Sequence, residues 1–242
     1  MAINLNAIPG WGKTSCVAHA PGVAFVLSPR ELGYITLFQN GLVPECPYQI
    51  ASTWNELLQI VRSVDGIETL AFDILGGFER LCHEHVCQQH FGGDWGERGF
   101  MNYQKGFGLA VNDWLQLLAA LDQLRNKGVN IVLLGHVKIE TFKNPNGPDF
   151  DRYACDVHKT IWGATHNWVS AALFGTFYQI VEEKKKGRAK GIGGTDRVLY
   201  TEHRDTWDAK NQYGMPEVID IPNDPSKVWT TIISNMKTRK AE

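Results

Sequence analysis

The segment AIPGWGKT, residues 7–14, constrains the fold of this chain more than any other feature of its sequence. It follows a short strand pattern, Ala2–Asn6, and leads into a helical pattern, Lys13–Ala20, which stops before Pro21-Gly22. Glycines at such a strand-to-helix turn let successive backbone N–H groups point inward toward an anion. The fold must therefore place a tight glycine turn between a strand and a helix. From its length, the whole chain, residues 1–242, is interpreted as one domain.

The residue types in this turn predict a phosphate-binding loop for ATP and Mg²⁺. Lys13 is expected to reach the β and γ phosphates, and the Thr14 hydroxyl to ligate Mg²⁺. Ala7 stands where the usual GxxxxGK(S/T) pattern has its first glycine, which is the mildest replacement at that position. The alternative is a glycine-rich turn that binds nothing. The predicted nucleotide-binding residues of the turn are Pro9, Gly10, Trp11, Gly12, Lys13, Thr14 and Ser15.

Strand and helix patterns alternate through the first half of the chain, which predicts βαβ units and a parallel sheet. Thr53 and Glu56 form a capping box that predicts the start of one helix, and Asp224-Pro225 predicts the start of a closing helix. The expected fold class is α/β, with a mainly parallel central sheet, helices on both faces and a β-rich C-terminal part. Besides Ala2–Asn6, the predicted strands are Val23–Leu27, Thr69–Ile74, Asn130–Gly135, Arg197–Thr201 and Glu217–Ile221.

Three segments are too polar or too irregular to be core elements. Residues 92–108 are rich in glycine and aromatic residues and are interpreted as a surface loop, and residues 138–159 as a long polar connection. The basic run Lys184–Arg188 is interpreted equally as a phosphate-contacting segment and as a solvated turn.

Charge and cysteine content limit how the protein could bind a polyanion and which cellular compartment it occupies. The formal net charge of −2 means that a polyanion would have to bind a local basic patch. Five cysteines without a CxxC pair argue against a secreted disulfide framework. Neither a signal-peptide pattern nor an apolar run of membrane-spanning length is present. We therefore expect a cytoplasmic protein without a membrane partner.

Polar residues at strand ends supply further candidates for the same site. Asp73 ends an apolar strand, which predicts a Mg²⁺-associated carboxylate beside the glycine turn. His136 ends the next strand and is a candidate sensor of the γ-phosphate, with a strand-end histidine bonded to backbone as the alternative. Glu31 is a candidate to orient the attacking water, or else an exposed loop glutamate. The predicted catalytic residues are thus Lys13, Asp73, Glu31 and His136.

A histidine and cysteine cluster, residues 82–90, offers a different chemistry. On a helix, His83, Cys87 and His90 share one face, which is a possible zinc site. Since no second Cys/His pair completes a tetrahedron, a half-buried helix is the favoured interpretation.

The chain resembles the phage-encoded, RecA-like P-loop proteins with an AAA domain, a group that includes single-strand annealing proteins of phage recombination. The resemblance covers nearly the whole chain. It is carried by the segments IPGWGKTS, LAFDIL, VLLGHVKIETFKNPNGPDFDRY, HKTIWGATHNWVSAALF and RVLYTEHRDTWDAKNQYGMP.

This resemblance implies a RecA-like ATP-binding core that acts on single-stranded DNA and assembles as a homo-oligomer with ATP near subunit boundaries. It also implies a phage or host single-strand binding protein as a partner. Lys210 matches the lysine of the family's AKNR-like motif and is expected to contact nucleotide, in its own or a neighbouring subunit; the alternative is a solvated lysine. Gln212 and Ser170 depart from the family pattern, as does the placing of Glu31, and these departures favour slow hydrolysis with nucleotide binding retained.

DNA contacts are expected on the loops after the strands that end at Asp73 and Gly135, where RecA-like cores present them. Three readings of the function remain open: an ATPase acting on single-stranded DNA, a non-hydrolysing ATP-dependent binding module, and a small-molecule phosphotransferase. The predicted DNA-binding residues, cations for phosphates and aromatics for stacking, are Tyr103, Lys105, Lys138, Lys143, Arg152 and Tyr153.

Overall fold

The computed structural model describes residues 1–182 and 190–237. The basic run at 184–188 therefore lies outside the described residues. The strands are β1 (Ala2–Ala7), β2 (Val23–Leu27), β3 (Tyr48–Ile50), β4 (Thr69–Asp73), β5 (Asn130–Phe142), β6 (Phe150–Cys155), β7 (Ala171–Glu182), β8 (Lys190–Tyr200), β9 (Lys210–Asn211) and β10 (Val218–Ile221). The helices are α1 (Lys13–Val17), α2 (Gly33–Gln39), α3 (Trp54–Ser63), α4 (Leu75–Phe91), the 3₁₀ turn η1 (Asn102–Gln104), α5 (Lys105–Asn126), α6 (Lys159–Trp168) and α7 (Pro225–Ser234).

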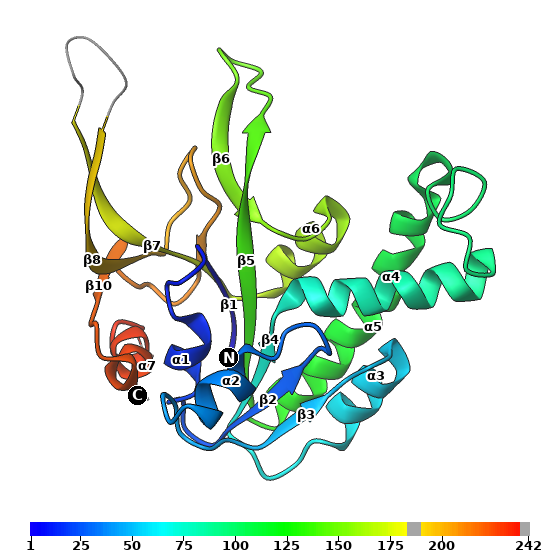
Figure 1. Ribbon diagram of the computed structural model, residues 1–242, viewed down its shortest axis with the longest axis horizontal. Coiled ribbons are helices and arrows are strands. Elements are labelled where there is room, and N and C mark those ends of the chain that lie inside the picture. Colours follow the sequence, from blue (N-terminus) through cyan, green and yellow to red (C-terminus); the bar gives the residue numbers. More distant parts are fainter. Residues whose placement is uncertain (183–189, 238–242) are drawn as a thin grey trace.

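The sheet follows the order β10-β8-β7-β1-β5-β4-β2-β3. Strands β7, β1, β5, β4, β2 and β3 run parallel, whereas β8 and β10 add an antiparallel edge. The predicted α/β class, with a mainly parallel sheet, helices on both faces and a β-rich C-terminal part, is confirmed (Figure 1). Strand β5 lies between β1 and β4, so the ends of these three strands meet at one edge of the sheet.

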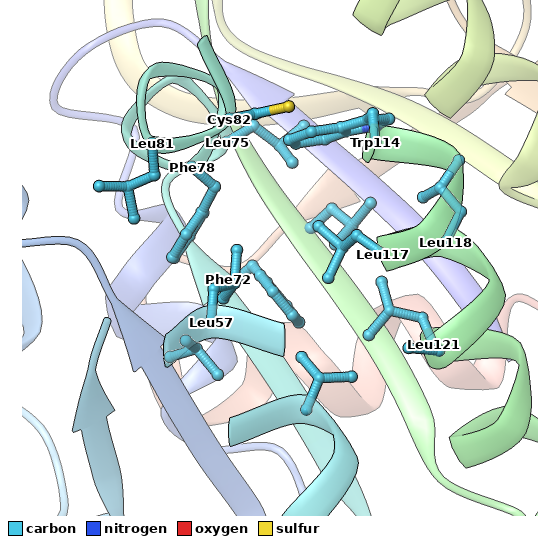
Figure 2. Packing of buried hydrophobic residues seen from close by; sticks show 14 of the residues in the cluster. Leu57, Phe72, Leu75, Phe78, Leu81, Cys82, Trp114, Leu117, Leu118 and Leu121 are labelled. Atoms are coloured by element: carbon cyan, nitrogen blue, oxygen red, sulfur yellow. The ribbon is translucent and has the colours of Figure 1, made fainter. Parts of the chain in front are cut away.

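Each face of the sheet has its own hydrophobic core. On one face, α3, α4, α5 and α6 cover the strands; Phe72, Phe78 and Trp114 are fully buried there (Figure 2). On the other face, α1, α2 and α7 cover them, with Phe25, Tyr34 and the Trp11 side chain inside. The central parallel strands are buried on both faces, and this explains why their sequences are almost continuously apolar.

The predicted helix starts are confirmed at both capping motifs. The Thr53 hydroxyl accepts a hydrogen bond from the Glu56 N–H at 3.2 Å, and the Glu56 carboxylate accepts one from the Ser52 N–H at 2.8 Å. Asp224 accepts from the Ser226 N–H at 3.0 Å, with Pro225 in the first turn of α7. These bonds satisfy N–H groups that have no acceptor within the helix.

Two predicted loops are wrong in part. Residues 138–159 contain a hairpin, because β5 continues beyond the sheet core to Phe142 and pairs antiparallel with β6 (Figure 1). Its residues are polar because few of them reach either core. Within residues 92–108, Phe100 is fully buried against Phe91, Trp95 and Phe107, so this segment is anchored rather than a surface loop throughout.

Among the described helices, none is both long enough and apolar enough to cross a membrane.

Candidate functional site

The glycine turn after β1 is held open by left-handed backbone at two glycines. Gly10 has a φ of 78° and Gly12 a φ of 96°, a region that residues with a Cβ atom rarely adopt. The first helical hydrogen bond of α1 runs from the Cys16 N–H to the Gly12 carbonyl at 3.0 Å. The N–H groups of Lys13, Thr14 and Ser15 precede that bond and have no acceptor within the helix. The turn therefore presents backbone donors as a phosphate-binding loop requires.

The Trp11 side chain packs into the core under the glycine turn and does not face a ligand. Its side chain is fully buried, and its indole Nε1 donates a hydrogen bond to the Thr176 carbonyl at 3.0 Å. The Trp11 backbone N–H donates to the Ile8 carbonyl at 3.3 Å within the turn. Pro9 and Gly10 are exposed at the tip of the turn. Trp11 thus differs from the prediction, because neither its ring nor its N–H is free for a nucleotide.

Lys13 lies folded back across the turn. Its Nζ donates to the Ala7 carbonyl at 3.0 Å and is 3.4 Å from Nδ1 of His136. Burial lowers the pKa of Lys13 to about 8, although the charges of Asp73 and Glu31 oppose this change. A buried ammonium with so few acceptors gains by meeting an anion, as expected for a lysine that reaches phosphates.

Asp73 meets Thr14 at the end of β4. The Thr14 hydroxyl donates to Oδ2 of Asp73 at 3.0 Å, while Oδ1 is buried without a hydrogen-bond partner among the described residues. Burial raises the pKa of Asp73 to about 6, partly offset by the bond from Thr14. An orphaned carboxylate oxygen beside a hydroxyl is the donor set that Mg²⁺ prefers. These two residues fit a bound Mg²⁺ and are the ones that would hold it.

The two other predicted catalytic residues come to the same edge. His136 pairs with Ala7 in the β1–β5 register, so its ring lies beside the glycine turn. Burial, and then the Lys13 charge, lower the pKa of His136, which favours a neutral ring. Glu31 follows β2 and is half-buried, and its charge acts on Lys13, Asp73 and His136 alike. The structure therefore gathers Lys13, Asp73, His136 and Glu31 into one site.

Lys210 lies elsewhere. Lys210 of β9 pairs with Ala172 of β7, which pairs with Asn4 in the middle of β1 and not with the residues that lead into the glycine turn. Its Nζ donates to the carbonyls of His166, Asn167 and Val169 at 2.8 to 3.1 Å. Lys210 thus caps the C-terminal end of α6, where a cation is favoured. Within its own chain it does not belong to the nucleotide site, and it is not a solvated lysine either.

The predicted DNA-binding residues fall into two groups. On the β5–β6 hairpin the cations face carboxylates: Lys138 is 3.5 Å from Asp156, Lys143 is 2.5 Å from Asp149, and Arg152 is 3.5 Å from Glu140. Tyr153 is half-buried and lies against Phe174, with 5.1 Å between ring centroids.

Tyr103 and Lys105 form the second group. Helix α4 begins directly after β4, so these two residues lie beyond α4 instead of in a loop after Asp73. Both are exposed, and the Tyr103 ring is 93% exposed.

The cluster at residues 82–90 does not converge on a metal. His83 packs edge-on against Phe100 and Phe107, and Cys87 lies in the hydrophobic core, whereas His90 is exposed. Within residues 1–182 and 190–237, no three histidine, cysteine or acidic side chains are arranged to hold a metal ion. Burial lowers the pKa of His83 to about 4, as expected for a neutral core histidine.

One residue of the site was missed by the sequence analysis. Arg197 of β8 reaches the glycine turn, where a Cβ atom placed on Gly12 would lie 3.2 Å from Nη1 of Arg197. Arg197 is remote from the turn in the sequence, and no local motif surrounds it. Only the strand order β8-β7-β1 brings the two together.

A family model described as an AAA domain matches residues 2–213. No curated protein matches the chain in sequence. Among solved structures, the flagellar accessory protein FlaH from Methanocaldococcus jannaschii is similar over 99% of this chain and 89% of that chain, with 10% identity and a TM-score of 0.43. A KaiC-like protein from Pyrococcus horikoshii OT3 is similar over 93% of this chain and 87% of that chain, with 12% identity and a TM-score of 0.39.

Proposed function

The chain belongs to an AAA-domain family of P-loop NTPases, and on this premise we propose that it binds ATP with Mg²⁺, hydrolyses it, and acts on single-stranded DNA. The observation that carries the nucleotide part is the bond from Thr14 to the buried carboxylate of Asp73, whose second oxygen has no partner among the described residues. Lys13 completes the arrangement, with its ammonium bonded to the Ala7 carbonyl and close enough to feel the charge of Asp73. Together they match the charge of a triphosphate and its cation.

The chemistry follows from the positions of these groups. Bound Mg²⁺ would supply positive charge that polarises the terminal phosphate, and Lys13 would add to it. Glu31 and His136 flank Lys13 and Asp73, where a residue must lie to orient the attacking water or to sense the terminal phosphate. Hydrolysis then needs positioning and charge neutralisation but no covalent intermediate on the protein.

We expect the affinity for Mg²⁺–ATP to be greatest between about pH 6 and about pH 8. Below about pH 6 the Asp73 carboxylate becomes protonated, and protons then compete with Mg²⁺. Above about pH 8 Lys13 loses its proton in the free protein, and its attraction for phosphate falls. Fluorescence titrations with a labelled ATP analogue across this range measure both limbs. Asp73→Asn is the control for the acid limb, because in this variant only the titration of ATP itself can lower the affinity below about pH 6. If the pH profiles of the wild type and of Asp73→Asn superimpose in this range, the assignment of the acid limb to Asp73 is contradicted.

Single-stranded DNA is the proposed partner because the exposed Tyr103 and Lys105 offer one stacking surface and one cation close together in sequence. Such a pair binds the backbone and bases of an unpaired strand without reading its sequence. Recombination or replication would use this activity, with self-association placing several such pairs along one strand. A single-strand binding protein would then be the partner that delivers the strand.

Phosphate release measured with and without single-stranded and duplex DNA at low salt, alongside particle size, tests this proposal. We expect stimulation by single-stranded DNA, and the double variant Tyr103→Ala/Lys105→Ala to weaken DNA binding by roughly 5- to 100-fold, since stacking on one aromatic contributes about 1–3 kcal/mol. Lys143→Ala is the matched control, because Lys143 already pairs with Asp149. ATP binding without turnover would instead support the non-hydrolysing module, and no binding of either DNA would overturn the DNA assignment.

A further inference from the structure

Arg197 of β8 places a cation beside the glycine turn, although it does not belong to the sequence motif of the turn. Its guanidinium lies against the Cα atom of Gly12, since a Cβ atom built there would be 3.2 Å from Nη1, 3.5 Å from Cζ and 3.6 Å from Nη2. Arg197 pairs with Phe177 of β7 on one side and Ile221 of β10 on the other. Leu199, two positions along the same strand, lies in the core beneath α1, so both side chains share that face. The position of Arg197 is thus set by the sheet.

Arg197 is half-buried, and part of its guanidinium lacks the partner that a buried polar group normally has. Both Nε and Nη1 of Arg197 are buried without a hydrogen-bond partner, and no carboxylate of the described residues lies within 4.0 Å of it. Arg80, Arg125, Arg152 and Arg204, in contrast, each pair with a carboxylate. Cys16 is near enough to feel the Arg197 charge, but burial raises the pKa of this thiol to about 12, so it supplies no anion.

Buried N–H groups without acceptors, such as Nε and Nη1 of Arg197, destabilise the free protein and are satisfied when an anion arrives. The sheet order shows which part of a nucleotide would reach it. Lys13, His136 and Asp73 lie toward β5 and β4, whereas Arg197 comes from β8 on the opposite side of β1. If the terminal phosphate and Mg²⁺ occupy the first side, the phosphates nearer the nucleoside leave the turn toward the second.

We propose that Arg197 binds the non-bridging oxygens of the α and β phosphates of a nucleoside diphosphate or triphosphate held in the glycine turn. This assignment rests on the proposed nucleotide binding. The planar fork of donors on a guanidinium suits two phosphate oxygens at once. Because ADP and ATP share these two phosphates, Arg197 contributes equally to the binding of both. A residue that sensed the terminal phosphate would discriminate between them.

The test compares Arg197→Met with wild-type protein by calorimetric titration of ADP and of ATP with Mg²⁺, and by thermal unfolding without nucleotide. We expect both affinities to fall by a similar factor, roughly 10- to 100-fold, as for the loss of a hydrogen-bonded charge. The unfolding temperature of the free protein should stay the same or rise, because the variant removes the two buried nitrogens that have no acceptor. Arg204→Met is the matched control, since Arg204 pairs with Glu217 at the surface and should leave both affinities unchanged.

Three results would overturn the assignment. Unchanged ADP and ATP affinities in Arg197→Met would show that no phosphate meets this side chain. A loss confined to ATP would move Arg197 to the terminal phosphate. A lower unfolding temperature without nucleotide would make Arg197 a structural residue. These results all require that the wild-type protein binds ADP; if the wild type binds neither nucleotide, the proposed function itself fails, and the two failures are thereby distinguished.

Discussion

Replacing Lys13 with alanine is expected to lower the affinity for Mg²⁺–ATP by roughly 100-fold or more. A lysine that contacts two phosphates makes at least two charge-assisted hydrogen bonds, and each of these contributes about 1.5–3 kcal/mol. The free protein should remain folded. Burial disfavours the charged form of Lys13 and lowers its pKa to about 8, so removing this ammonium costs the free protein little stability. Nucleotide-induced shifts of the unfolding temperature measure the affinity and the fold together.

Lys138→Ala is the matched control for this variant. Lys138 also belongs to β5, two positions after His136, but its ammonium already lies 3.5 Å from Asp156. Its removal should change the affinity for ATP by less than about threefold, in line with an exposed ion pair. Equal losses in the two variants would mean that the general charge of this edge, and not a specific contact of Lys13, attracts the nucleotide.

Gly175→Ala is expected to destabilise the protein and disturb the glycine turn at the same time. A Cβ atom at Gly175 would lie 2.7 Å from Cε2 of Trp11 and 3.0 Å from Cβ of Ala7. Trp11 is fully buried and bonded to the Thr176 carbonyl, and the Gly175 carbonyl accepts a hydrogen bond from the Ile8 N–H at 3.2 Å. Overpacking of this kind costs about 1–3 kcal/mol of unfolding free energy. Since the indole lies beneath the turn, its displacement should also weaken ATP binding.

Chemical denaturation measures the first effect and nucleotide titration the second. Gly163→Ala in α6 is the control, because a Cβ atom there would meet nothing within 4 Å. Alanine is the better helix former, so this variant should be as stable as the wild type or more stable by up to about 1 kcal/mol. If Gly175→Ala is as stable as Gly163→Ala and binds ATP normally, the indole does not hold the turn in place.

The sequence predicts the parts of the site that lie close to a recognisable local signal. The turn at residues 7–14 has its own glycine pattern, and Asp73 and His136 each end an apolar run, so strand order alone brings them to one edge. The observed β2, Val23–Leu27, agrees with its prediction at both ends because it is uniformly buried.

Features that depend on distant packing were not predictable in this way. The hairpin of β5 and β6 is polar because it extends beyond both cores, and Ile139 in it is 65% exposed, so it lacks the alternation of a half-buried strand. Arg197 reaches Gly12 because β8 pairs with β7 and β7 pairs with β1, and the registers of these two pairings bring Arg197 to the end of β1 where the turn begins. The hydrogen-bond partners of Trp11 and Lys210 within the chain, Thr176 and the end of α6, were not predictable for the same reason, since they are remote in sequence.

The most direct test of the nucleotide site is a calorimetric titration of the full chain with ATP, in the presence and absence of Mg²⁺. If Lys13, Thr14 and Asp73 form the site described above, ATP binds with one site per chain, Mg²⁺ strengthens the binding, and Asp73→Asn removes that strengthening. The absence of any binding heat from ATP, confirmed by an unchanged unfolding temperature, would contradict the account.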